Sequence, residues 1–76
     1  MTRAPLSARL KVRLARLYQA LGKWQESITL VKEVLQVKRH HAEAAYVAGL
    51  GMLHLGDSTA AADYFEQSLS NITTEH

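Results

Sequence analysis

The sequence predicts an all-α protein, built from two antiparallel helix-turn-helix hairpins that stack as a short α-solenoid in a single domain. Three observations predict this fold. Apolar residues recur at helical spacing in four runs, two leucine–glycine pairs lie 34 residues apart, and no segment alternates as a strand does. We expect helices over residues 6–21, 24–38, 41–55 and 58–71, joined by short turns.

The first expected helix has a row of leucines on one face. They recur at i, i+4, i+7 and i+11, as Leu10, Leu14, Leu17 and Leu21. Ser7 is a candidate N-cap, because a serine hydroxyl accepts hydrogen bonds from the free N–H groups of a first helical turn. Gly22 follows the last leucine and is typical of the glycine that ends a helix.

The later helices have their own boundaries. The second begins near Trp24 and ends in a run of basic and polar residues, which suits the negative end of a helix dipole. The third contains no charge over residues 44–53, and a helix that is apolar all round is normally buried all round. Gly56 ends it, and Asp57 or Ser58 would cap the fourth helix.

The net charge of +2 is unevenly distributed. Residues 1–25 contain six basic residues and no acid, whereas residues 26–76 contain seven acids and three basic residues. Such asymmetry bears on the binding partner more than on the fold. Hydrophobic residues make up 47% of the chain, which is too many for a disordered protein.

The composition favours a cytoplasmic, intracellular location. The chain has no cysteine, so disulfides and thiolate metal sites are excluded. No apolar run approaches the roughly 20 residues that span a bilayer, and we expect no membrane contact. We also expect no secretory signal; the arginine-rich start loosely resembles a mitochondrial transit peptide, but the first helix uses the same residues.

Residues 8–41 and 42–75 align as two repeats of 34 residues. The identical pairs are Ala8/Ala42, Leu21/Leu55, Gly22/Gly56 and Leu35/Leu69. Similar residues fall at further packing positions, among them Ala15 and Gly49. A helix-turn-helix period of this length, with small and large residues at these places, resembles the tetratricopeptide repeat.

The sequence departs from that family's pattern at two places. The large residue near the start of the first helix is Lys11 in one repeat and Ala45 in the other, and Arg39 and Thr73 replace the closing proline. The resemblance implies that neither hairpin covers its own apolar face, so that the hairpins stack. It also implies a protein-interaction module of adaptor, scaffold or co-chaperone type.

No motif for catalysis or for a cofactor holds up. Residues 49–56 start like a dinucleotide-binding loop, but His54 replaces its third glycine and no strand precedes it, so close helix packing is the better explanation. Neither the pair His40–His41 nor His54 with Asp57 matches a zinc-binding pattern. We therefore expect no enzymatic activity, no cofactor and no metal.

In the family that the sequence resembles, the first helix of each repeat lines the concave binding surface. Carried over residue by residue, this lining consists of Arg9, Val12, Arg16, Gln19, Ala20, Glu43, Tyr46, Leu50, Leu53 and His54. Arg9, Arg13 and Arg16 share one helix face, and guanidinium groups match carboxylates well. We expect a groove with basic and apolar sections that binds an acidic peptide or another subunit.

Other interpretations of the basic helix remain open. Arg9 and Arg13 are similar to the pair with which some family members clamp C-terminal carboxylates of heat-shock chaperones, but Arg16 and Val47 stand where asparagines complete the clamp. The helix could also be a solvated face that only aids solubility. Alternatively it binds nucleic acid or an anionic surface, although the chain shows no recognised nucleic-acid module.

The predicted array is short for a solenoid. Solenoids generally need about three repeats and a polar capping helix, and residues 71–76, after the last expected helix, are too few for a cap. We therefore expect either a homo-oligomer or a part of a longer solenoid or complex. The basic first helix and the acidic remainder would suit contact between the ends of two copies.

Overall fold

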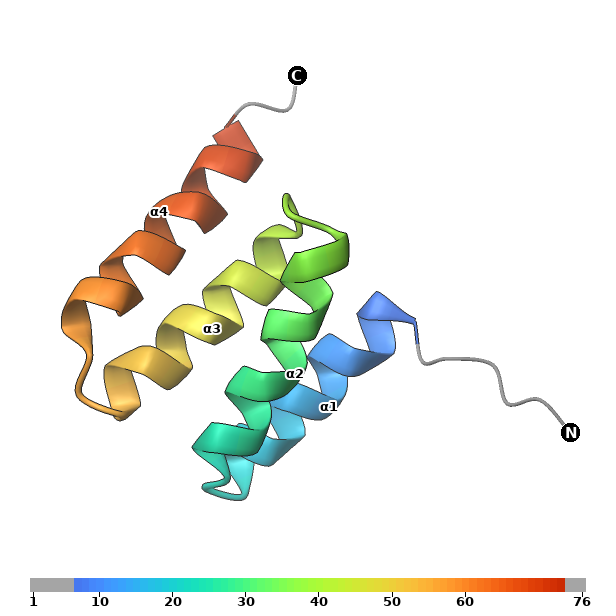
Figure 1. Cartoon of the computed structure of the whole chain (residues 1–76), viewed down its shortest axis with the longest axis vertical. Coiled ribbons are helices and arrows are strands. Elements are labelled where there is room, and N and C mark those ends of the chain that lie inside the picture. The colour runs from blue at the N-terminus through green and yellow to red at the C-terminus, as the bar shows by residue number, and fades with distance from the viewer. Residues whose placement is uncertain (1–6, 74–76) are drawn as a thin grey trace, which may run out of the picture.

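The computed structural model describes residues 7–73, and the side chains of residues 7–70. This part of the chain forms four helices: α1 (Ala8–Ala20), α2 (Trp24–Val37), α3 (Ala42–His54) and α4 (Ser58–Thr73) (Figure 1). The predicted all-α fold with two hairpins is confirmed. α4 continues two residues beyond its expected end, and the expected start of the first helix at residue 6 lies outside the described residues.

Both hairpins turn at a glycine in the left-handed conformation. Gly22 has a φ of 78° and Gly56 a φ of 89°. The N–H of Gly22 donates to the carbonyl of Gln19 at 3.0 Å, and the N–H of Lys23 donates to that of Tyr18 at 2.7 Å. The second hairpin has the same two bonds around Gly56. This pair of bonds is the Schellman motif, so the prediction that these glycines end their helices is confirmed.

Side chains cap α1 and α4 as predicted. The Ser7 hydroxyl accepts a hydrogen bond from the N–H of Leu10 at 3.2 Å. The Asp57 carboxylate accepts one from the N–H of Ala60 at 3.1 Å, which decides the choice between Asp57 and Ser58. Each cap satisfies one of the N–H groups that a first helical turn leaves without a partner.

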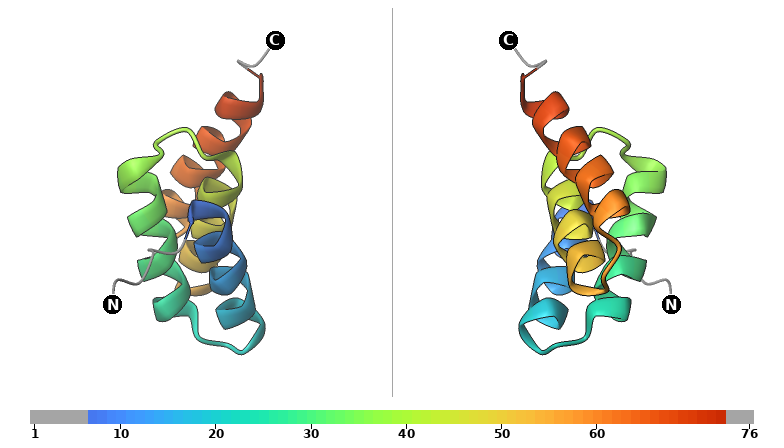
Figure 2. Two further views of the ribbon diagram at one scale, coloured as in Figure 1. Left: turned by 90° about the vertical axis from the view of Figure 1, so that its right-hand side faces the viewer. Right: turned by 90° about the vertical axis from the view of Figure 1, so that its left-hand side faces the viewer.

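Helix α3 lies in the middle of the molecule. It packs against α1, α2 and α4 (Figure 1). Views from the right-hand and left-hand sides of Figure 1 show the α1–α2 hairpin in front in one and α4 in front in the other (Figure 2). Six residues of α3 are buried, but Tyr46 and Leu53 are 50% and 54% exposed. The prediction that this apolar helix is buried all round is therefore wrong.

The core is made of small side chains. The largest fully buried residues are Val12, Val31, Val47 and Ser27. A Cβ atom on Gly49 would lie 2.5 Å from the ring of Phe65, and one on Gly51 would lie 2.6 Å from the Ile28 side chain. Gly49 and Gly51 therefore serve close helix packing, as predicted, whereas Gly56 forms the turn.

The row of leucines on α1 and its C-cap, hereafter the leucine face (Leu10, Leu14, Leu17, Leu21), lies outside the core cluster, and of the four only Leu14 is half-buried. Val12 and Ala15 are buried instead. Leu10, Leu17 and Leu21 are 51%, 61% and 69% exposed. The spacing predicted the helix correctly but not its buried face, because close approach of α2 and α3 leaves room only for small residues.

The described helices were also searched for a membrane span. None of those within residues 7–73 combines the length and the apolar character that crossing a bilayer requires.

Candidate functional site

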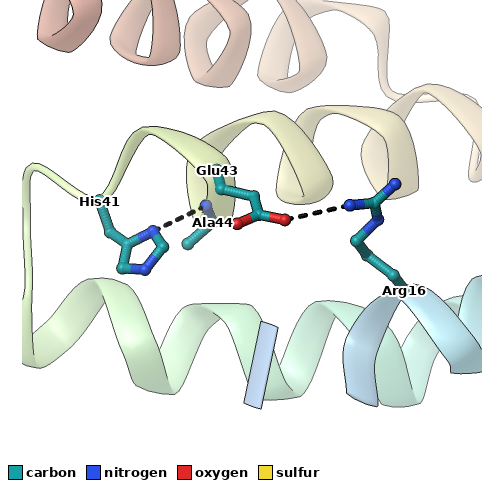
Figure 3. Close-up of polar contacts among 4 residues, drawn as sticks. All are labelled: Arg16, His41, Glu43 and Ala44. Atoms are coloured by element: carbon teal, nitrogen blue, oxygen red, sulfur yellow. Dashed lines mark hydrogen bonds and ion pairs between the residues drawn. The ribbon is translucent and has the colours of Figure 1, made fainter. Parts of the chain in front are cut away.

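Three arginines of α1 are exposed on its surface: Arg9, Arg13 and Arg16. The Nη1 atom of Arg16 lies 3.1 Å from Oε2 of Glu43, at the start of α3 (Figure 3). Both side chains are largely exposed, so we expect this ion pair to stabilise the fold by at most about 1 kcal/mol. Its importance lies in its place, because it joins the first helices of the two hairpins.

A shallow hollow surrounds this ion pair, and it is lined by Arg13, Arg16, Leu17 and Glu43. A second, mainly apolar hollow shares Glu43 and is also lined by Ala42, Tyr46, Ser68 and Leu69. We call the two adjoining hollows the groove. Its section on α1 is basic, and its section between α3 and α4 is apolar.

Three residues predicted to line the binding surface are engaged in holding the fold. Val12 is fully buried in the core, which corrects the prediction that its side chain meets a partner. The Gln19 side-chain amide donates to the carbonyl of Val47 at 3.0 Å. The His54 ring stacks on that of Trp24, with 3.7 Å between centroids and 12° between planes, and so joins the end of α3 to the start of α2.

The remaining predicted residues lie on the surface of α1 and α3. Arg9 and Ala20 are exposed, outside both hollows, and Leu50 is half-buried. The Tyr46 ring lies 5.7 Å from that of Phe65, centroid to centroid, and tilts by 44° against it, and Tyr46 is half exposed.

Sequence reasoning did not place Leu17, Ser68 or Leu69 in the groove. The last two come from α4, and only the packing of α4 on α3 brings them beside Tyr46. The repeat alignment held one usable indication, because Leu69 is identical to Leu35 in the first repeat.

The polar residues that were compared with metal ligands have structural contacts. The Nδ1 atom of His41 accepts a hydrogen bond from the N–H of Ala44 at 3.2 Å and so caps α3 (Figure 3). Asp57 caps α4, and His54 stacks on Trp24. Within the described ranges, no group of three or more histidine, cysteine or acidic residues is placed to hold a metal ion.

Comparison with known families agrees with this geometry. A family model described as the tetratricopeptide repeat matches residues 6–73. The chain belongs to the tetratricopeptide repeat family. Searches of curated proteins and of solved structures give no significant match. Tetratricopeptide repeats are generally protein-interaction modules, in a fold that is typically non-catalytic.

In this pair of tetratricopeptide repeats, α1 and α3 are the equivalent first helices. The contact between Arg16 and Glu43 therefore crosses from one repeat to the next on the side where those helices are exposed. Val47, which the sequence comparison gave as a candidate position for a clamp asparagine, has a buried side chain. That position therefore adds no side chain to the groove.

Proposed function

We propose that this chain is a protein-interaction module of adaptor or scaffold type, which binds an acidic segment of another protein in the groove. The observation that carries the proposal is the contact between Arg16 and Glu43 at 3.1 Å. A guanidinium of α1 already holds a carboxylate at the distance of a charge-assisted hydrogen bond. A partner's carboxylate would meet the neighbouring arginines in the same way.

The other two arginines are available for this role. Among the residues that the structure describes, no ion pair engages Arg9 or Arg13. They lie one helical turn apart, so acidic side chains of an extended peptide could reach both. Guanidinium groups suit the task because their planar forks match carboxylates in a bidentate manner.

The apolar section indicates a second property of the partner segment. Tyr46 and Leu69 are 50% and 63% exposed beside the shared residue Glu43. Burial of apolar surface supplies most of the affinity in such grooves, while charges supply orientation and speed of encounter. We infer a partner segment in which an acidic residue is followed or preceded by an apolar one.

Binding of nucleic acid by α1 is the less supported alternative. Lys11 Nζ lies 3.2 Å from Glu33 Oε1, and Arg16 is paired with Glu43. Two of the four basic residues of α1 thus have acidic neighbours. A phosphate backbone is bound best by an unbroken basic surface, and these carboxylates interrupt it.

Affinity capture with mass spectrometry tests the proposal directly. The tagged chain is compared with a variant in which Arg9→Glu, Arg13→Glu and Arg16→Glu are combined. A matched control carries Lys23→Glu, Lys32→Glu and Lys38→Glu, which changes the net charge equally at exposed residues outside the groove. Circular dichroism confirms that both variants remain helical.

We expect the arginine variant to lose the captured proteins and the lysine variant to retain them. Unchanged yields with the arginine variant would show that the groove is not the binding site. Titration with labelled single- and double-stranded oligonucleotides tests whether α1 binds nucleic acid instead. Tight binding that weakens steeply with added salt and is lost in the arginine variant would favour nucleic acid.

A further inference from the structure

We propose that copies of this chain dock head to tail, so that the leucine face of one copy covers the open end of the α3–α4 hairpin of the next. The occupant of each uncovered apolar surface is thus a second copy. This self-association covers Leu17, Tyr46 and Leu69, which also line the groove, so docking of a copy and binding of a partner segment exclude each other at these residues.

The packing of the α1–α2 hairpin against α3, which we call the internal junction, is the model for the proposed contact between copies. Helix α3 contributes to the shared core with Ala44, Val47 and Ala48, all at most 1% exposed. Thirty-four residues earlier, the same places of the repeat hold Leu10, Arg13 and Leu14 on α1. The α1–α2 hairpin covers the positions on α3, whereas on α1 Leu10 and Arg13 are exposed and Leu14 is half-buried.

The open end of the α3–α4 hairpin, hereafter the receiving end, exposes residues whose equivalents in the first repeat are covered. Val12 is fully buried in the core that α3 completes, and its equivalent Tyr46 is 50% exposed. Leu35 is half-buried and packs against that core, whereas its equivalent Leu69 is 63% exposed. Each is an apolar residue at a place that a following hairpin would cover.

The sizes of the side chains are reversed between the two junctions. In the internal junction Gly51 lies so close to Ile28 that a Cβ atom would approach to 2.6 Å. At the proposed junction Leu17 takes the place of Gly51, and Ala62 takes the place of Ile28. The larger leucine thus faces the smaller alanine, which preserves the summed volume as packed interiors require.

Charge favours this orientation over a symmetric one. Residues 7–41 contain eight basic and two acidic residues, whereas residues 42–73 contain four acidic residues and no lysine or arginine. Head-to-tail docking brings hairpins of opposite charge together, and a symmetric pairing of two leucine faces would bring like charges together. The junction also leaves Arg9 exposed, because its equivalent Glu43 is exposed at the internal junction.

Two complementary variants test the proposal by sedimentation velocity and light scattering. The first carries Leu10→Gln and Leu17→Gln on the leucine face. The second carries Leu53→Gln and Leu69→Gln on the receiving end. All four residues are more than half exposed, so the fold should survive, and Val37→Gln, at an 82% exposed residue outside both surfaces, is the matched control.

We expect the mass of the unchanged chain and of the control to grow with concentration beyond a dimer, because a head-to-tail contact does not close. Added salt should weaken this association. Each double variant should be monomeric at concentrations at least about tenfold higher. An equimolar mixture of the two should form a dimer and nothing larger, since one intact junction remains.

Three results would overturn the proposal. The unchanged chain could stay monomeric up to its solubility limit. The receiving-end variant could still dimerise, which would show symmetric pairing of leucine faces. The mixture could fail to associate although circular dichroism shows both variants folded. None of these results by itself overturns the groove proposal, whose test is the capture of other proteins by the arginines of α1.

Discussion

At the scale of single residues, Ser27 is the least satisfied member of the core. Its side chain is fully buried, and among the described residues no hydrogen bond reaches its hydroxyl oxygen. The equivalent residue of the second repeat is Ala61, which is buried as well. A buried hydroxyl without a partner destabilises the folded state.

We predict that Ser27→Ala raises the free energy of unfolding by about 1 kcal/mol, because it removes an unsatisfied polar group at little loss of volume. Ala61→Ser is the matched control and should lower it by a similar amount. Urea denaturation followed by circular dichroism measures both. A loss of stability in Ser27→Ala would mean that the hydroxyl is hydrogen bonded in solution.

Local chemistry made several residues predictable from the sequence. Gly22 and Gly56 were predictable as helix ends, because a helix commonly ends at a glycine in the left-handed conformation. Ser7 and Asp57 were recognised as caps because their side chains act within three residues. Val12 was misplaced, since its burial depends on α3, which lies about thirty residues away in the sequence.

At the scale of elements, the contact between α3 and α4 depends on one close approach. The ring of Phe65 lies against the backbone of Gly49, where a Cβ atom would come within 2.5 Å. This contact holds α4 to α3, and α4 in turn supplies Ser68 and Leu69 to the groove.

We predict that Gly49→Ala lowers the free energy of unfolding by roughly 1–2 kcal/mol, because overpacking against the ring outweighs the better helix propensity of alanine. Adding Phe65→Leu should recover part of the loss. Thermal denaturation of the two single variants and the double variant measures the coupling free energy between Gly49 and Phe65. If Gly49→Ala alone stabilised the protein, the ring would have to move away freely.

The period of the sequence predicted the elements better than their faces. The starts of α1 and α3 differ by 34 residues, as do those of α2 and α4, and this regularity follows from equivalent glycines. The leucine face was the exception, because apolar spacing identifies a helical stripe without saying what covers it. The groove depended even more on packing, since α4 contributes to it.

At the scale of the whole molecule, stability should be unequal along the chain. Helix α3 packs against all three others, whereas α4 packs closely on α3. The core shared by both hairpins consists of valines and alanines from the first three helices. Regions with few buried contacts open more readily than the rest of a fold.

We predict that amides in the middle of α3 exchange with solvent most slowly, and that those near the end of α4 exchange at least about tenfold faster, because among the described residues α4 adds only Tyr64 to the packing around the shared core. Hydrogen exchange of the leucine-face variant, followed by mass spectrometry, measures this without interference from association. Equal protection in all four helices would show that the molecule opens only as a whole.

The stack between Trp24 and His54 gives the molecule an internal optical reporter. Trp24 is the single tryptophan of the chain, and its ring lies 3.7 Å from that of a residue in the other hairpin. Its fluorescence therefore responds when the two hairpins separate, even if both remain helical, and also when either hairpin melts. A change in emission that precedes the loss of helical circular dichroism would reveal hairpins that part while still folded.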